Sequence, residues 1–511
     1  MRVVLVYAKN RRIQQIADHS AGFGKQQGEY SFDEVYPPIG IASLGAVLRE
    51  QGYEVRLLDD SVETEEAVDE GLQWADVVGI GALTSNARRG RELGLRAREL
   101  GKFTILGGPH PTITPEYFLE AGACDVTVQS EADLTLPEII EKKDRRSEWK
   151  DILGITYLED GQMRANPRRP FNKALDSLPF PAYDLYDMPK YWKRMTNPGI
   201  SIMSSRGCPY SCTFCDEEMT PRNYRALSAA RTVDLIEYLL KTYNPPQLFF
   251  FDDLFTIQRK RVLAICEEIL KRKLFFEWNC ESRVDTVDYE LLRAMRRAGC
   301  IKVYYGLESG SPEQLIAIKK KVTPEGILKG ARLNRELAMY FKFFIIYGFP
   351  GETERDHRLT EDLIKKAMPH NVAVSLLCPH KGTEVYDQIK DRIIHHPEDV
   401  EYGYWHQTEM WRHDVFTYDE LQAERKRLVQ VHKSHCTGLK ARLWRKLDRA
   451  RAMIRHPELI GDLFEQRVRK LQYKRRIREW IKDGHMDVEA AMEHRRRAPT
   501  LAPTSHSFFS S

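Results

Sequence analysis

The sequence predicts an α/β protein with three parts: a doubly wound, Rossmann-like parallel sheet, an incomplete (β/α)6 TIM-like barrel and a helical C-terminal region. Apolar strand candidates alternate with helical stretches from residue 1 to about residue 145, as in a parallel sheet covered by helices. The alternation resumes at Gly199 and ends near His395, where long helical runs begin. A chain of 511 residues, 42% of them hydrophobic, can bury the cores of two to four domains.

The first domain, residues 1–145, is expected to bind a ligand in the loops that follow its strands. The expected strands are Val3–Tyr7, Glu54–Leu58, Val77–Gly81, Thr104–Leu106 and Val126–Val128, and the expected helices are Ile39–Gln51, Glu65–Trp74, Ala87–Leu100 and Pro115–Ala121. Such sheets bind ligands at the carboxyl ends of their strands. Loops 36–43, 81–86 and 107–112 lie at those ends. A nucleotide site is one reading, although no G-x-G-x-x-G follows the first strand, and purely structural turns are another.

Residues 146–196 predict an adapter with a hairpin that turns at Asp160-Gly161, and residues 197–390 predict the partial barrel. The expected barrel strands are Ile200–Ser204, Leu248–Phe251, Phe275–Cys280, Lys302–Gly306, Phe341–Tyr347 and Val372–Leu377. The helices expected between them are Thr232–Tyr243, Lys260–Lys271, Tyr289–Ala298, Pro324–Leu337 and Glu354–Lys366. Six strand–helix units without a seventh indicate an incomplete barrel. Barrel enzymes place their chemistry on the loops that follow the strands, where polar clusters recur in this sequence.

The loop after the first barrel strand carries three closely spaced cysteines, Cys208, Cys212 and Cys215, in a C-x3-C-x2-C pattern. Three thiolates can hold three irons of a [4Fe–4S] cube, whose closure normally takes a fourth. No fourth cysteine lies nearby, so one iron stays open to a small molecule. Zinc is the alternative, but structural zinc takes four closed ligands. Arg206 precedes the loop and either offsets cluster charge or lies on the surface.

This pattern, with the aromatic Phe214 before the last cysteine, resembles the radical S-adenosylmethionine (SAM) superfamily. The resemblance implies that SAM chelates the open iron and that one electron cleaves it to a 5′-deoxyadenosyl radical. The segment 305–310 resembles the family's G-x-E-S-G strand end, which implies that Glu308 and Ser309 lie near SAM. Arg283 resembles the family's R-x-D position and could pair with the SAM carboxylate.

Each of these assignments has a structural alternative. Glu308 could cap a helix at the strand end, and Arg283 could pair only with Asp285. Asp252 and Asp253 stand where many relatives carry a glycine-rich G-G-E, so one of them is expected to meet SAM, and the sequence does not say which. No residue is assigned as a catalytic hydrogen donor or base.

Taken in order, the loops of the first domain resemble the cobalamin-binding domain that precedes many radical SAM enzymes. The matching segments are P-P-I-G, a Ser/Thr turn and G-G-P-H-P-T. The resemblance implies that Thr84, Ser85, Gly107 and Gly108 line the corrin or its tail. A D-x-H-x-x-G signature, which would supply an axial histidine, is absent from residues 58–63. His110 is either a ligand-facing residue or part of a turn.

The combined resemblance implies a cobalamin-dependent radical SAM enzyme, a class B-type methyltransferase that acts on an unactivated carbon through the 5′-deoxyadenosyl radical and methylcobalamin. A cyclase, oxidase or rearrangement enzyme with the same cofactors is the nearest alternative. A non-catalytic Fe–S protein for electron transfer or sensing is the distant one. The expected partners are a small-molecule substrate and a reductant such as flavodoxin or ferredoxin.

Composition limits the other function classes. The net charge of +4 gives no reason to expect a nucleic acid. No apolar run is long enough to span a membrane, and no signal peptide is visible, so a cytoplasmic protein is expected. Residues 391–494 predict a helical region that serves as a lid or as a solvated appendage. Its basic run Lys470–Trp480 fits contact with anionic lipid, an acidic partner or solvent. Residues 495–511 are expected to be disordered.

Overall fold

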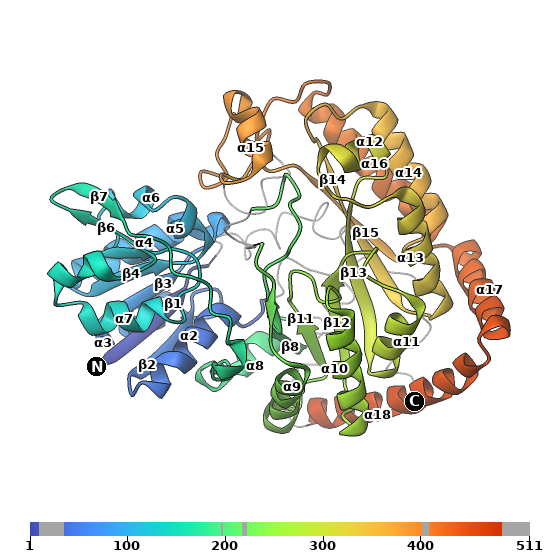
Figure 1. Ribbon diagram of the computed structural model, residues 1–511, viewed down its shortest axis with the longest axis horizontal. Coiled ribbons are helices and arrows are strands. Elements are labelled where there is room, and N and C mark those ends of the chain that lie inside the picture. Colours follow the sequence, from blue (N-terminus) through green and yellow to red (C-terminus); the bar gives the residue numbers. More distant parts are fainter. Residues whose placement is uncertain (10–34, 196–197, 217–221, 401–407, 483–511) are drawn as a thin grey trace.

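A computed structural model of the chain describes residues 1–9, 35–195, 198–216, 222–400 and 408–482 (Figure 1). The N-terminal sheet has seven strands in the order β2-β1-β3-β4-β5-β6-β7. Its strands are β1 (Arg2–Tyr7), β2 (Glu54–Asp59), β3 (Val77–Gly81), β4 (Phe103–Gly107), β5 (Val126–Val128), β6 (Ile155–Glu159) and β7 (Gln162–Ala165). The first five are parallel, and β6 and β7 form an antiparallel hairpin at the edge.

Alternate residues of β1 face two different helical layers, which confirms the doubly wound arrangement. Val3 and Leu5 pack in the core that includes α2 (Ile39–Glu50) and α7 (Thr135–Lys142). Val4 and Val6 pack in the core that includes α3 (Glu65–Trp74) and α4 (Ala87–Glu99). The short helices α5 (Pro109–Ile113) and α6 (Glu116–Leu119) lie between β4 and β5. Because the strand order reverses at β1, the ends of β1 and β3 form the switch point of the sheet.

The adapter extends the N-terminal sheet and then carries the chain to the barrel. Its hairpin β6–β7 turns at Asp160-Gly161 as expected, with φ of 50° and 76°. The 3-10 turns η4 (Leu175–Ser177) and η5 (Tyr183–Leu185) and the short helix α8 (Met188–Trp192) follow. Buried tyrosines join the parts: Tyr183 donates to the carbonyl of Ser201, 2.5 Å away, and Tyr191 donates to Asp59, 3.1 Å away.

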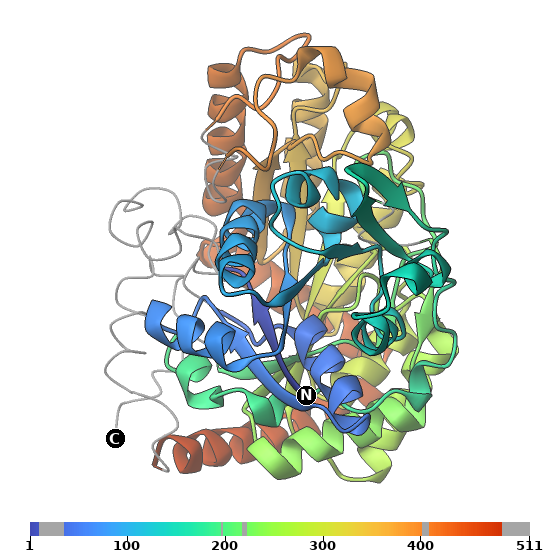
Figure 2. The same cartoon turned by 90° about the vertical axis from the view of Figure 1, so that its left-hand side faces the viewer.

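The barrel is a six-stranded parallel sheet in the order β15-β14-β13-β12-β11-β8, as the sequence predicted. Its strands are β8 (Gly199–Ile202), β11 (Gln247–Phe250), β12 (Glu277–Ser282), β13 (Cys300–Glu308), β14 (Tyr340–Tyr347) and β15 (Asn371–Leu376). The connecting helices are α9 (Ala229–Tyr243), α10 (Arg259–Lys271), α11 (Tyr289–Arg297), α12 (Pro312–Ala317), α13 (Pro324–Glu336) and α14 (Glu354–Ala367), with α15 (Glu384–Ile389) after β15. Figure 2 views the molecule from the N-terminal domain, which lies in front of the barrel.

The C-terminal helices pack on the outside of the barrel. Helix α16 (Tyr418–Cys436) lies against β15 and α14, α17 (Leu439–Arg455) against α13, and α18 (Glu458–Lys482) against α11. The lid role stays a prediction for the segment before α16, where His413 lies 2.8 Å from the carbonyl oxygen of Phe349. The expected disordered tail lies outside the described residues. Of the helices described, none is long and apolar enough to cross a membrane.

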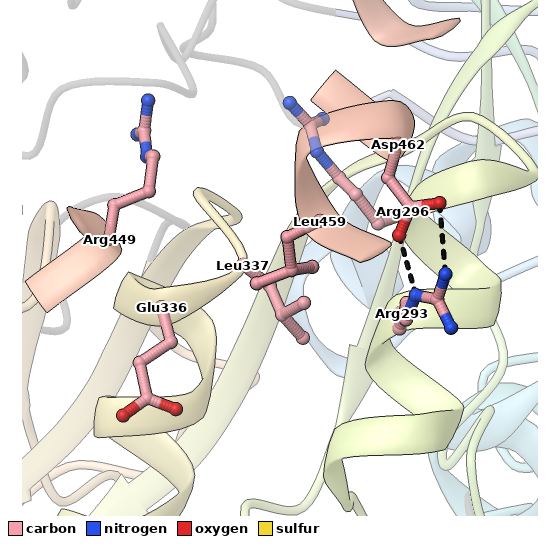
Figure 3. A pocket seen from close by; sticks show the side chains of 7 residues that line it. All are labelled: Arg293, Arg296, Glu336, Leu337, Arg449, Leu459 and Asp462. Carbon is pink, nitrogen blue, oxygen red and sulfur yellow. Dashed lines mark hydrogen bonds and ion pairs between the residues drawn. The ribbon is translucent and has the colours of Figure 1, made fainter. Parts of the chain in front are cut away.

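Ion pairs fix the outer helices to the barrel. Asp448 of α17 accepts from Arg335 of α13 at 2.6 Å, and both side chains are buried. Asp462 of α18 accepts from Arg293 of α11 at 2.5 Å. Figure 3 shows this second pair at a small pocket between the four helices, whose other lining residues are Arg296, Glu336, Leu337, Arg449 and Leu459. The pocket lies on the helical layer of the barrel and not at the strand ends.

Candidate functional site

The three cysteines lie on a loop that a small antiparallel ladder closes. Strand β9 (Ser205–Arg206) precedes the loop and pairs with β10 (Arg225–Ala226), which follows it. Gly207 has a φ of 82°, a left-handed conformation that glycine adopts without strain, so the chain turns sharply into Cys208. None of the nine cysteines of the chain, all of which are described, forms a disulfide. The loop therefore offers three thiols within eight residues.

Two carboxylates at the end of β11 hold the start of this loop. Asp252 is fully buried and accepts hydrogen bonds from the backbone N–H of Ser204 at 3.2 Å and from its hydroxyl at 2.8 Å, and also from the Ser205 hydroxyl. Burial raises the pKa of Asp252, while these donors oppose that shift. Asp253 accepts from the backbone N–H of Gly207 at 3.0 Å. Both predicted SAM-contacting acids thus position the cluster loop in this structure, and contact with SAM stays a prediction for each.

Positive side chains flank the cysteine loop. The guanidinium carbon of Arg283 lies 3.8 Å from the ring centre of Tyr210, and Nζ of Lys320 lies 5.8 Å from that of Phe214. Burial raises the pKa of the Cys208 thiol, whereas the charge of Arg283 lowers it. Because iron binds thiolates, cations beside the loop favour the form that binds.

The donor set fits an iron–sulfur cluster with an open iron. Thiolates are the ligands of such clusters, and the loop supplies three of them next to two cations. Within the residues that the structure describes, no three His, Cys, Asp or Glu side chains converge on a single metal ion. The case for the cluster therefore rests on the thiol spacing and on the surroundings of the loop.

Glu308 lies at the end of β13 in a left-handed conformation, with a φ of 65°. A register shift between Gly306 and Glu308 interrupts the pairing of β13 with β14 at this point. The carboxylate pairs with the buried Nζ of Lys320 at 2.8 Å. A non-glycine residue in this conformation costs energy, which is a common feature of functional sites. The predicted role of Glu308 in binding SAM stays open, and Lys320 is its partner in this structure.

Arg283 is joined to Glu308 through the same lysine. Its guanidinium binds Asp285 with two hydrogen bonds of 3.0 Å and donates to the backbone carbonyl of Lys320 at 2.6 Å. The structural pair with Asp285 is therefore present, and a further contact with SAM stays a prediction. Ser309 is fully buried, and its hydroxyl accepts a hydrogen bond of 3.2 Å from the N–H of Ser311, the residue directly before α12.

Polar side chains alternate with core residues along the barrel strands. Val303, Tyr305, Phe341 and Phe343 belong to the hydrophobic core, so their neighbours in sequence face the opposite side of the sheet, the inside of the barrel. Lys342 lies between two of these core residues, and Asn279 and Glu281 lie on either side of the core residue Cys280, so all three occupy such inward positions. Burial raises the pKa of Glu281 to about 7, and the charge of Lys342 opposes this shift. The inside of the barrel thus carries a carboxyl group that titrates near neutral pH.

The four residues predicted to line a corrin lie together at one edge of the N-terminal sheet. Thr84 and Ser85 follow β3 in a 3-10 turn, Gly107 ends the adjacent strand β4, and Gly108 follows it directly before α5. Gly108 has a φ of 103°, and a Cβ there would lie 2.7 Å from the carbonyl oxygen of Ala82. Gly108 therefore lets the backbone that follows β4 pack closely against the loop after β3. Binding of cobalamin by these particular residues stays a prediction.

Other polar residues near that edge are engaged within the protein. Asp59 accepts from the N–H of Ser61 at 2.9 Å, and burial raises its pKa to about 6. Asp60 forms a buried pair with Arg89 at 2.7 Å. The ring of His110 lies 3.0 Å from the hydroxyl of Thr114, and burial lowers the pKa of His110 to about 4. His110 is therefore buried in the short helix α5, where its ring contacts Thr114, and a ligand-facing role for it stays a prediction.

An ion-pair cluster, which the sequence did not reveal, links the cysteine loop to the N-terminal domain. Arg206 of β9 binds Asp133 at 2.6 Å and Glu131 at 3.2 Å. Arg225 of β10 binds Glu131 at 2.6 Å. We call Arg206, Arg225, Glu131 and Asp133 the interdomain clamp. Burial lowers the pKa of Arg206, but its two acidic partners outweigh this and raise it overall.

A second contact joins the domains near the switch point. The ring of Tyr36 meets the rings of Phe249 and Phe251 edge-on, with centroids 5.2 Å and 5.3 Å apart. Tyr36 directly precedes the P-P-I-G segment, and both phenylalanines come from β11 or its end. The strand that carries Asp252 and Asp253 thus touches the loop that enters α2.

Comparison with known proteins agrees with this arrangement. Residues 31–140 match the B12 binding domain, and residues 202–364 match the Radical SAM superfamily. An uncharacterized methyltransferase of Pyrococcus horikoshii is 32% identical over 359 residues, which cover 69% of this chain and 78% of that protein. The anaerobic magnesium-protoporphyrin IX monomethyl ester cyclase of Rubrivivax gelatinosus is 27% identical, over 70% of this chain and 67% of that protein.

A solved structure shares the fold. The cobalamin-dependent SAM radical enzyme OxsB, with aqua-cobalamin and SAM bound, covers 97% of this chain and 83% of its own, with a TM-score of 0.69 and 16% identity. The two matched domains, the similarity to the P. horikoshii protein and the shared fold all indicate the same family. The chain therefore belongs to the B12-binding radical SAM family, with a [4Fe–4S] cluster, S-adenosylmethionine and cobalamin as its cofactors.

Proposed function

We propose that this enzyme transfers a methyl group from SAM, by way of cobalamin, to an unactivated carbon of a small molecule. One observation carries the proposal: the P. horikoshii protein, named as a methyltransferase, is 32% identical to this chain over 78% of its own length. A match of that length exceeds either domain alone. The two relatives described above do not indicate a substrate class for this chain.

The cofactors and the residues around the cysteine loop would have separate roles in this reaction. When bound, the cluster and SAM supply hydrogen-atom abstraction, and cobalamin supplies the methyl group. Asp252 and Asp253 hold the loop that carries the thiols, while Arg283 and Lys320 place positive charge beside it. Glu281, inside the barrel and with a pKa raised to about 7, can hold or release a proton near the substrate space.

A cyclization without methyl transfer is the second candidate, because the R. gelatinosus cyclase is 27% identical over 67% of its length. The two candidates differ in what becomes of the SAM methyl group. A methyltransferase of this type consumes two SAM molecules and forms both S-adenosylhomocysteine and 5′-deoxyadenosine. A cyclase forms 5′-deoxyadenosine without S-adenosylhomocysteine.

The test uses anaerobically reconstituted protein with cobalamin, a chemical reductant and SAM carrying a labelled methyl group. We expect S-adenosylhomocysteine and transfer of the label to cobalamin, measured by mass spectrometry. The variant Cys212→Ala should still bind cobalamin but form no 5′-deoxyadenosine. Deoxyadenosine without S-adenosylhomocysteine would favour the cyclase. The absence of both products would favour a non-catalytic Fe–S protein.

A further inference from the structure

The outer faces of α17 and α18 carry large apolar side chains that are exposed in the part of the chain that the structure describes. On α17, Leu439, Leu443, Leu447 and Ile454 are 84%, 57%, 46% and 81% exposed; on α18, Ile460, Phe464, Val468 and Leu471 are 61%, 70%, 41% and 65% exposed. We call these eight residues the outer stripe. Their spacings of three, four or seven residues place each set on one face of its helix. An apolar surface of this extent on a folded protein indicates a binding surface.

The opposite face of α17 explains why the stripe points outward. Ala441, Asp448 and Ala452 are buried against the barrel, and Asp448 pairs with Arg335 at 2.6 Å. A helix oriented only by the hydrophobic effect would turn its leucines toward the core. Small residues and a buried ion pair instead hold α17 the other way round. In α18, Asp462 likewise faces inward and pairs with Arg293.

The surroundings of the outer stripe are strongly basic. Residues 439–482 contain 15 Lys and Arg against 5 Asp and Glu. Two of the five acids, Asp448 and Asp462, already pair with arginines of the barrel. On α17, the exposed side chains Lys440 and Arg451 lie on one side of the stripe and the exposed Lys446 on the other, by helical geometry. Any partner therefore meets an apolar centre with basic borders.

This combination selects an anionic lipid surface as the occupant. Amphipathic helices with a Lys/Arg-rich polar face and Leu, Trp or Phe on the other lie in the interface of a membrane. Trp444 is 47% exposed, and tryptophan is typical of the interface between membrane and water. A second copy of the chain would bring two basic surfaces together, which like-charge repulsion opposes. Figure 1 shows α17 on the side of the barrel remote from the N-terminal domain.

We propose that α17 and α18 dock this protein onto membranes that contain anionic lipids, with the outer stripe in the headgroup region. The test is co-sedimentation of the full chain with vesicles of phosphatidylcholine alone and with vesicles that also contain phosphatidylglycerol. We expect binding to the anionic vesicles that is at least tenfold tighter than to the neutral ones and that weakens as salt rises. The inference does not rest on methyl transfer, and the assay measures no activity.

Variants separate the stripe from the rest of the surface. The triple variant L443S/L447S/I454S should bind anionic vesicles at least tenfold more weakly than the original chain, with unchanged circular dichroism because these residues are exposed. Ile316→Ser is the matched control, since Ile316 is 78% exposed on α12, away from the outer helices, and it should change nothing. K446E/R451E should lose the preference for anionic lipid.

Three outcomes would overturn the proposal. The first is equal binding to neutral and anionic vesicles, or to neither. The second is full binding by the triple variant. The third is a dimer of the original chain, measured by light scattering, that the triple variant converts to a monomer without vesicle binding; the stripe would then be an interface between copies.

Discussion

The interdomain clamp makes a quantitative prediction about Asp133. Replacing Asp133 by alanine removes two hydrogen bonds, of 2.6 Å and 3.1 Å, from Arg206. The side chain of Asp133 is 6% exposed and that of Arg206 is 22% exposed. Two unit charges about 4 Å apart attract by about 4 kcal/mol at an effective dielectric constant of about 20. Because Glu131 still binds Arg206 and solvent reaches part of it, we expect Asp133→Ala to lower the free energy of unfolding by about 2–3 kcal/mol.

The assay is urea denaturation of the anaerobically prepared protein, with two comparisons. Asp184→Ala removes an exposed pair with Arg49, whose side chains are 46% and 45% exposed, and should cost at most about 1 kcal/mol. The double variant R206M/D133A should cost less than the sum of its single variants by at least about 1 kcal/mol, because each single variant already removes the same Arg206–Asp133 pair. Equal costs for Asp133→Ala and Asp184→Ala, or simple additivity in the double variant, would refute this reasoning.

Three further predictions concern single residues. Cys212→Ala should lose most of its iron and sulfide after anaerobic reconstitution, measured chemically, whereas the buried Cys266→Ala should keep both. Gly108 has a φ of 103°, and a Cβ there would clash with the backbone, so Gly108→Ala should lower the free energy of unfolding by about 1–3 kcal/mol and reduce the amount of bound cobalamin. Gly122→Ala is the control, because Gly122 has a φ of 68° with open space around it, and should cost about 1 kcal/mol. Equal changes in melting temperature for the two variants would contradict the clash. Burial raises the pKa of Glu281 from 4.5 to about 7, so the folded state favours the protonated acid, and the stability that this acid contributes is lost as pH rises through 7. Glu281→Gln should therefore remove up to about 3 kcal/mol of the dependence of unfolding free energy on pH. A variant whose unfolding free energy changes with pH as that of the original chain does would argue against this reasoning.

Periodicity made the architecture predictable from the sequence. Helix α3 begins at Glu65 and ends at Trp74, as its pattern of apolar residues indicated, and the six barrel strands appear in chain order. Both results follow from local rules, since apolar residues repeat every 3.6 residues in helices and alternate in strands. The three cysteines also form a local motif, so their spacing alone led to the prediction that they hold the cluster, which stays a prediction.

The partners of the site residues were not predictable, because they depend on contacts between distant segments. Asp133 meets Arg206 across 73 positions of sequence, and no local pattern marks either residue. Lys320 meets Glu308 only because Glu308 takes a left-handed conformation at a register shift. The burial of Asp252 beneath the cysteine loop likewise follows from how β8 and β11 pair, which strand patterns alone do not specify.

The aromatic contact of Tyr36 with β11 affects how the N-terminal domain and the barrel can move relative to each other. Phe249 and Asp253 are four residues apart on one chain, a reach of about 14 Å at most. One end of this short segment contacts Tyr36 of the N-terminal domain, and the other accepts a hydrogen bond from Gly207 at the start of the cysteine loop. Because this short segment contacts both the N-terminal domain and the cysteine loop, a movement that pulled the two apart would have to break the contact of Tyr36 with Phe249 or the hydrogen bond of Gly207 with Asp253.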